Sequence, residues 1–158
     1  MEAIEQALND LGAGISQQLR TDIASKSVTK YGSVNASGKL AKSIRYEATP
    51  NNLKVYALNY FYYVENGRKG GKRPPRSVIR QWIIDKGIKP QGKISIDSLA
   101  FLIQRKIGES GTTAFQQGGT KLLEDVATKE RIDMVRQQIA LTMQNQLIRT
   151  AFSNVIIK

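Results

Sequence analysis

The amino-acid sequence predicts an α+β fold with a long N-terminal helix, a small antiparallel β-hairpin sheet, two short helices and a long C-terminal helix. Apolar residues recur every three or four positions near both ends of the chain, which is the spacing of an amphipathic helix. Between these ends, two strand-like runs flank Pro50-Asn51-Asn52, a sequence that favours a turn. The 158 residues contain no internal repeat and have the size of one domain, 1–158.

The N-terminal helix is expected from about Glu2 to Ser27. Gly12 and Gly14 weaken it locally and permit a kink, because glycine is a poor helix former. Its apolar face would consist of Ile4, Leu8, Leu11, Ile15, Leu19 and Ile23.

A short helical turn and a hairpin are expected next. Ser37 is a candidate cap for the turn, which would direct Leu40 and Ile44 inward. The hairpin strands are predicted at 45–49 and 53–58. Apolar residues occupy both odd and even positions of the second strand, so we expect both of its faces to be partly covered, one by the core and the other by a neighbouring subunit.

Four consecutive aromatic residues, 60–63, follow the hairpin. We interpret them as a core plug between the hairpin and the basic loop that comes next. The alternative is stacking of the rings on nucleic-acid bases. A contiguous run of aromatic residues is weaker evidence for base stacking, because a stacking platform needs exposed rings at alternating positions.

Two short helices and two loops complete the middle of the chain. A helix is expected from about Pro75 to Lys86, ended by Gly87, with Trp82 as a core anchor. Ser95 or Asp97 would cap a second helix that ends near Gly108. Segments of about 67–75 and 110–120 are predicted to be flexible loops, since they are rich in glycine and poor in apolar residues.

The C-terminal helix is expected from Ile132 onward. Its polar positions hold amides more often than charges, which is typical of a contact surface for a neighbouring subunit. A plain surface helix packed on its own core is an equal alternative. The amides are Gln137, Gln138, Gln144, Asn145 and Gln146.

The composition argues against an enzyme. The chain has no cysteine and no histidine, so disulfides, thiolate or imidazole metal sites and Ser-His or Cys-His nucleophiles cannot form. The carboxylates are scattered, which does not favour a metal-dependent nuclease. We therefore expect no catalytic residue, no metal and no cofactor. No apolar run of 18 residues or more is present and the N-terminus lacks signal-peptide features, so neither membrane insertion nor secretion is expected.

The positive charge of the chain is concentrated in one segment. The net charge is +11, and residues 68–93 hold nine cations against the single acid Asp85. This segment is expected to face DNA or an acidic protein partner, with a solvated loop as the alternative. A phosphate-binding P-loop is excluded because the spacing from Gly67 to Gly71-Lys72 is wrong and no Ser or Thr follows. The expected contact residues are Arg68, Lys69, Lys72, Arg73, Arg76 and Arg80.

Several motifs occur in a characteristic order between about Ser33 and Val126. A Ser-Gly-x-Leu-x-x-Ser-Ile segment precedes the hairpin, and an aromatic-x-x-aromatic-Val-Glu-x-Gly-Arg segment follows it. This order resembles the tail-component and head–tail joining proteins of long-tailed bacteriophages. Two positions depart from the usual pattern, namely Phe61 in place of Ala and the direct succession of Gly67 and Arg68. The motif residues are Ser37, Gly38, Leu40, Ser43, Ile44, Tyr60, Tyr63, Glu65, Gly67 and Trp82.

The resemblance implies a structural virion protein that forms a homo-oligomeric ring at the neck or the tail end. Its partners would be portal or connector proteins and tail proteins, with genomic DNA passing through the ring without sequence-specific contacts. It would reside in the virion, and in the host cytoplasm during assembly. Glu65 is expected to be structural and to pair with Arg45 or Arg68. A stand-alone nucleic-acid-binding protein using the basic segment 67–93 is the alternative.

Overall fold

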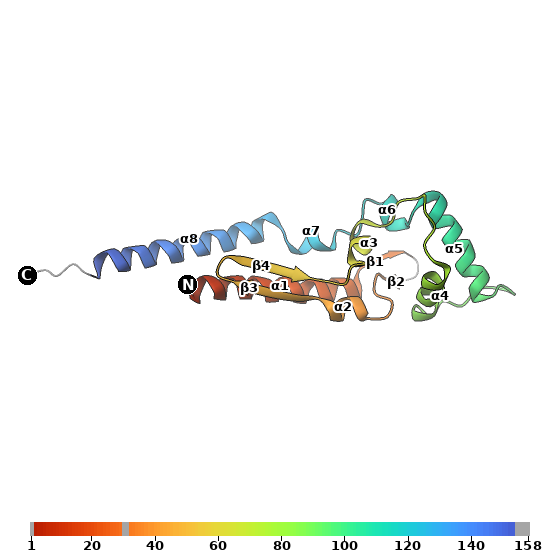
Figure 1. Ribbon diagram of the computed structural model, residues 1–158, viewed down its shortest axis with the longest axis horizontal. Helices are drawn as coiled ribbons and strands as arrows, with labels where there is room; N and C mark the ends of the chain where they lie inside the picture. Colours follow the sequence, from red (N-terminus) through yellow and green to blue (C-terminus); the bar gives the residue numbers. More distant parts are fainter. Residues whose placement is uncertain (1, 30–31, 154–158) are drawn as a thin grey trace, which may run out of the picture.

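The protein is elongated in the computed structural model, which describes residues 2–29 and 32–153 (Figure 1). Both long helices lie in one half of the molecule, together with the hairpin, and a pair of shorter helices forms the opposite end. The α+β prediction is confirmed. The elements are α1 (Glu2–Ser25), β1 (Ser27–Thr29), β2 (Gly32–Ser33), α2 (Lys39–Ser43), β3 (Arg45–Thr49), β4 (Asn52–Tyr56), α3 (Phe61–Asn66), α4 (Arg76–Asp85), α5 (Ile96–Ser110), α6 (Thr113–Gln116), α7 (Leu122–Val126) and α8 (Lys129–Phe152).

The β3–β4 hairpin packs against α1. Its antiparallel register pairs Arg45 with Tyr56 and Thr49 with Asn52, so the turn lies at Pro50-Asn51, as predicted. The hairpin lies close to the helix because Gly12 is buried, and a Cβ there would overlap the ring of Tyr46. The glycine that weakens the helix in the sequence therefore allows helix and hairpin to approach.

Within the chain, the central part of β4 is covered on one face, and the neighbouring subunit expected on the other face stays a prediction. Leu53 and Val55 are half-buried, whereas Lys54 between them is exposed. The strand thus has one covered face, which is the ordinary pattern for an antiparallel pair with helices on one side only.

The larger hydrophobic core lies between α1, α2 and α7. Leu40 and Ile44 are buried in it, as predicted. The expected cap is wrong, however, because Gly38 and not Ser37 is the N-cap of α2. Gly38 has a left-handed conformation with φ of 76°, and its N–H donates to the side chain of Asn35 at 3.0 Å. The buried members of this core are Ile15, Leu19, Ile23, Leu40, Ile44, Leu122 and Val126.

A second, smaller core joins α4 and α5 at the far end. Ile79, Ile83 and Ala100 are buried there, with Trp82 packed against them, so Trp82 is a core residue as predicted. Ser95 caps α5 and its side chain accepts the N–H of Ser98. The helix ends at Ser110, two residues beyond the expected end.

The pair β1–β2 and the short helices α3, α6 and α7 were not predicted from the sequence. The short antiparallel pair β1–β2 has too few residues for a recognisable alternation. The segment 110–120 was expected to be a loop, but it contains α6, capped by Thr112, whose side chain accepts the N–H of Phe115. The N-cap threonine stabilises this single turn.

Candidate nucleic-acid interface

The basic loop 67–75 is hydrogen-bonded along one side to the last turn of α5 and to the segment that follows it. The N–H of Gly71 donates to the carbonyl oxygen of Gly108 at 2.6 Å. Arg68 exchanges two bonds with Thr112: its N–H donates to the threonine hydroxyl at 2.9 Å, and its carbonyl accepts the Thr112 N–H at 2.9 Å. The loop has no helix or strand, as predicted, yet its backbone position is determined by these bonds.

Glycine permits this close approach of two backbones. Gly67 has a φ of +71°, and a Cβ there would overlap the backbone of Phe115. Gly111 has a φ of +80°, and a Cβ there would lie 2.6 Å from the carbonyl oxygen of Arg68. Gly67 and Gly111 are therefore required for this packing, in addition to breaking regular structure.

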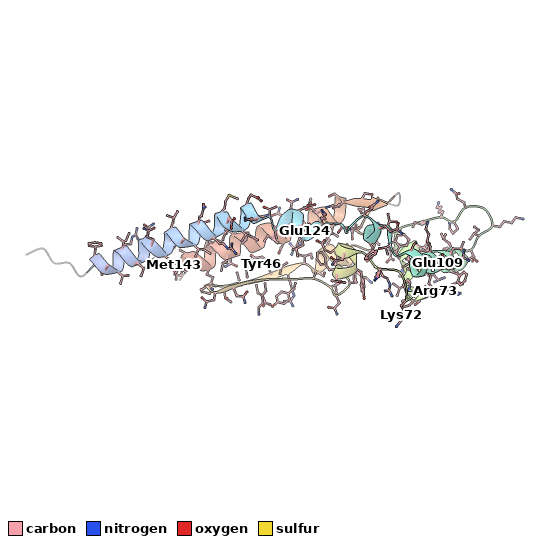
Figure 2. All side chains as sticks on the ribbon, turned by 90° about the horizontal axis from the view of Figure 1, so that it is seen from above. Tyr46, Lys72, Arg73, Glu109, Glu124 and Met143 are labelled. Atoms are coloured by element: carbon pink, nitrogen blue, oxygen red, sulfur yellow. The ribbon has the colours of Figure 1, made fainter. Side chains whose placement is uncertain are left out.

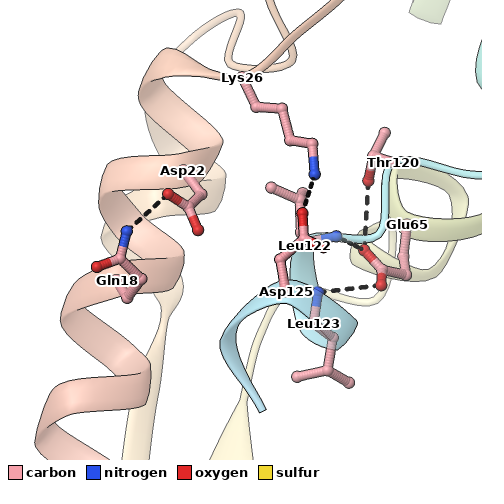
Figure 3. A network of polar contacts seen from close by, with 8 residues as sticks. All are labelled: Gln18, Asp22, Lys26, Glu65, Thr120, Leu122, Leu123 and Asp125. Atoms are coloured by element: carbon pink, nitrogen blue, oxygen red, sulfur yellow. Dashed lines mark hydrogen bonds and ion pairs between the residues drawn. The ribbon is translucent and has the colours of Figure 1, made fainter. Parts of the chain in front are cut away.

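Glu65 joins α3 to the start of α7 (Figure 3). Its carboxylate accepts the backbone N–H of Leu122 at 2.8 Å and that of Leu123 at 3.0 Å. It also accepts the hydroxyl of Thr120 at 3.3 Å. A structural role for this acid was expected, but the expected arginine partners are wrong, since backbone groups at a helix N-terminus satisfy the carboxylate.

The two arginines proposed for Glu65 have other partners. Arg45 forms an ion pair with Glu47 at 3.0 Å and lies over the ring of Tyr56. The guanidinium of Arg68 lies 5.5 Å from the ring centroid of Tyr63 and donates to the carbonyl oxygen of Lys72 at 3.2 Å.

The aromatic run 60–63 does not form a core plug. Residues 61–66 are helical, so only Phe61 and Val64, three residues apart, pack against the core. Tyr60, Tyr62 and Tyr63 are 43%, 65% and 52% exposed. The plug interpretation is thus correct for Phe61 and wrong for the tyrosines, because a helix directs consecutive side chains to different sides.

The exposed rings and the cations form one continuous strip. The rings of Tyr62 and Tyr63 meet edge to face, with centroids 5.6 Å apart. Arg68 extends the strip from the ring of Tyr63 to the backbone of Lys72 through the two contacts given above. Partial burial of the neighbouring Tyr60 raises the pKa of its hydroxyl.

The predicted contact residues are distributed over the loop and α4. Lys72 and Arg73 project from the end of the molecule that lies opposite Met143 of α8 (Figure 2). The side chain of Arg73 lies against Gly108, and Arg80 is exposed on α4. Arg76 differs from the others because it forms an ion pair with Asp97 at 3.1 Å and lies over the ring of Phe101.

Lys86, in the same basic segment, faces the protein. Its ammonium donates to the carbonyl oxygens of Ser33 and Asn35, the latter at 2.6 Å. Partial burial lowers its pKa from 10.5. This lysine therefore links the end of α4 to the segment after β2 and is not a surface contact residue.

The motif residues lie in two groups. Leu40 and Ile44 belong to the larger core, and the Ser43 hydroxyl accepts the N–H of Leu58 at 3.2 Å, which joins α2 to the end of the hairpin. Glu65 and Gly67 meet the segment 112–123 as described above, whereas Tyr63 contacts Tyr62 and Arg68. Both groups stabilise the fold. The Ser-Gly-x-Leu-x-x-Ser-Ile motif lies in the larger core and at the end of the hairpin, away from the basic surface.

Within residues 2–29 and 32–153, no group of three or more acidic side chains could hold a metal ion. No helix in that part of the chain is long and apolar enough to cross a membrane. The strip 62–72 offers planar rings and positive charge, the two features that bind bases and phosphates. No family model, curated protein or solved structure matches the chain.

Proposed function

We propose that this protein is a non-enzymatic structural subunit of a long-tailed bacteriophage virion, which forms a homo-oligomeric ring at the head–tail junction or the tail end. The ring would join portal or connector proteins to tail proteins and would flank the DNA passage. The order of the sequence motifs supports this assignment, and the surface of α8 supports the assembly.

The observation that carries the proposal is the exposure of α8. It contacts α1 in its first half, yet none of its described residues is buried. In Figure 1 its second half continues beyond the first turn of α1. A helix of 24 residues gains most of its stability from packing of an apolar face, so this surface requires a partner. Its exposed large hydrophobic residues are Met134, Leu141, Met143, Leu147, Ile148 and Phe152.

These residues occupy more than one face of α8. Ile132, Val135 and Ile139 are half-buried and lie on one side of the helix. Met134, Leu141 and Ile148 are spaced by seven residues and lie on the opposite side. A helix with apolar residues on opposite sides is suited to being covered from both.

The charge distribution favours other copies of this chain as the partner. Each copy carries +11, so copies repel one another over most of their surface. Residues 137–148 hold no charged side chain and are therefore a place where two copies can meet without that repulsion. Contacts between different surfaces of neighbouring copies close into a ring when the rotation between subunits allows it.

The test is the mass of the purified chain and its appearance by negative-stain electron microscopy. We expect ring-shaped particles many times heavier than the 17.6 kDa chain. Leu141→Lys places a charge on the exposed stripe and should dissociate the particles. Gln17→Lys, which adds the same charge at an exposed position of α1, should leave them intact. A wild-type chain that remains monomeric at every concentration contradicts the ring.

The second candidate function is a stand-alone nucleic-acid-binding protein that uses the segment 67–93. The contact of Arg68 with the ring of Tyr63 favours nucleic acid as a ligand of this segment. The two functions differ in assembly, since the stand-alone protein would bind DNA with a steep salt dependence as a monomer.

A further inference from the structure

We infer that the strip of Tyr62, Tyr63, Arg68 and Lys72 is a binding site for single-stranded polynucleotide. Unpaired bases would stack on the tyrosine rings, and the cations would bind the adjacent phosphates. This inference rests on side-chain geometry and does not depend on the proposed ring.

The helical conformation of residues 61–66 makes the rings accessible. In a strand, four consecutive aromatic residues would place two rings on each face. In α3, Phe61 and Val64 face the core while Tyr62 and Tyr63 are more than half exposed. Exposed aromatic side chains are the groups on which unpaired bases stack.

The cations beside the rings are available to a polyanion. Arg68 contacts a ring and a carbonyl oxygen, neither of which neutralises its charge. Among the described residues, no carboxylate forms an ion pair with Lys69, Lys72 or Arg73, whereas Arg76 is paired with Asp97. The cations closest to the rings in the chain therefore keep their positive charge available for a polyanion.

The strip is also pre-organised. Three backbone–backbone hydrogen bonds, and a fourth bond from the Arg68 N–H to the Thr112 hydroxyl, hold the chain between Glu65 and Gly71 against the segment 108–120. Gly67 and Gly111 allow the two backbones to touch. A ligand would not need to order this part of the loop when it binds, which lowers the entropic cost of binding.

The exposed rings favour a single strand over two other polyanions, a nucleic-acid duplex and an acidic protein surface. In a duplex, the bases are stacked on one another and cannot reach Tyr62 or Tyr63. An acidic protein surface needs the cations but not a pair of exposed rings. Single strands use both parts of the strip, because every base has a flat face and every nucleotide a phosphate.

The experiment is a fluorescence-anisotropy titration of the full-length chain at low salt with labelled oligo-dT, oligo-U and a DNA duplex, each of about 16 nucleotides or base pairs. We expect tighter binding of at least one single strand than of the duplex. Comparison of oligo-dT with oligo-U shows whether the protein prefers single-stranded DNA or RNA, because base stacking alone does not discriminate between them.

The variants separate stacking from charge. Tyr62→Ala with Tyr63→Ala should weaken single-strand binding about tenfold or more and leave duplex binding within about twofold, because only unpaired bases stack. Tyr62→Phe with Tyr63→Phe retains the rings and should bind like the wild type. Val78→Ala, which truncates an exposed apolar side chain outside both the strip and α8, is the control.

Lys72→Gln should weaken binding of both ligands and reduce the slope of log affinity against log salt by about 0.7 for the single strand. Lys54→Gln removes the same charge from the exposed face of the hairpin and should have little effect. Circular dichroism would verify that each variant is folded.

Two results would overturn the inference: duplex binding equal to single-strand binding with no effect of the tyrosine substitutions, or no binding of either single strand at low salt. Neither result bears on ring formation, which is measured without nucleic acid.

Discussion

The carboxylate of Glu65 in α3 accepts the backbone N–H of Leu122, the first residue of α7, at 2.8 Å. Together with its bonds to Leu123 and Thr120, this contact joins elements that lie 57 residues apart in the chain. Leu122 is fully buried in the larger core, and α8 begins shortly after α7. Glu65 thus sets the position from which the exposed C-terminal helix departs.

Glu65→Ala is expected to lower the free energy of unfolding by about 2–3 kcal/mol, because two helix N–H groups and the Thr120 hydroxyl lose a charged acceptor. Urea denaturation would measure the change. Glu124→Ala removes an exposed acid from the first turn of the same short helix and should cost less than about 0.5 kcal/mol. Equal losses in the two variants would show that the bonds of Glu65 are not important for stability.

The contact of α1 with the hairpin depends on the absence of a side chain at position 12. Gly12→Ala is expected to destabilise the protein by about 1–2 kcal/mol, since the cost of displacing the ring of Tyr46 exceeds the gain of about 1 kcal/mol in helix propensity. Gly14→Ala meets only the end of the Arg131 side chain, which can move, so it should be neutral or stabilising. Thermal unfolding of both variants tests the difference, and a more stable Gly12→Ala would contradict the close packing.

The contact between the backbone of the basic loop and the segment 108–120 is the third place where we expect a substitution to lower the free energy of unfolding. Gly67→Ala combines a left-handed φ of +71° with overlap of the Phe115 backbone, so we expect a loss of more than about 2 kcal/mol. Gly118→Ala has a similar φ of +82° but open space around it, and should cost only about 1 kcal/mol. Chemical denaturation would give both values. Similar losses would mean that backbone conformation matters at position 67 and the neighbouring backbone does not.

The Tyr56 hydroxyl donates a hydrogen bond to the carboxylate of Glu47 at 2.8 Å. This bond is the main reason that the pKa of Tyr56 is raised above 10.0, while nearby Arg45 acts in the opposite direction. Because the folded state holds this proton more tightly than the unfolded state, the stabilisation is present below pH 10 and is lost as the pH rises through the raised pKa.

Glu47→Gln is therefore expected to lower the pKa of Tyr56. Alkaline titration of tyrosinate absorbance would measure it, with Tyr56→Phe in both backgrounds to identify the contribution of this residue. If the Tyr56 signal titrates at the same pH with and without Glu47, the hydrogen bond does not control its ionisation.

The sequence alone was sufficient for the elements whose signals are local. The spacing of apolar residues predicted α1 and α8, Pro50-Asn51 predicted the turn of the hairpin, and Ser95 and Gly87 predicted the boundaries of helices. The burial of Leu40 and Ile44 and the packing of Trp82 against the second core followed from the same spacing. These features depend on neighbours within one or two helical turns, which a sequence displays directly.

The tertiary structure decided what depends on residues far apart in the chain. The partners of Glu65 lie at 120–123 and no spacing rule connects them, so the sequence suggested arginines where backbone N–H groups are present. The exposure of Tyr62 and Tyr63 required knowledge that residues 61–66 form a helix on the core and not a strand through it. The spacing of apolar residues also predicted the helix α8. It could not show that Met134, Leu141 and Ile148 have no packing partner within the described part of the chain, because burial is determined by the path of the whole backbone.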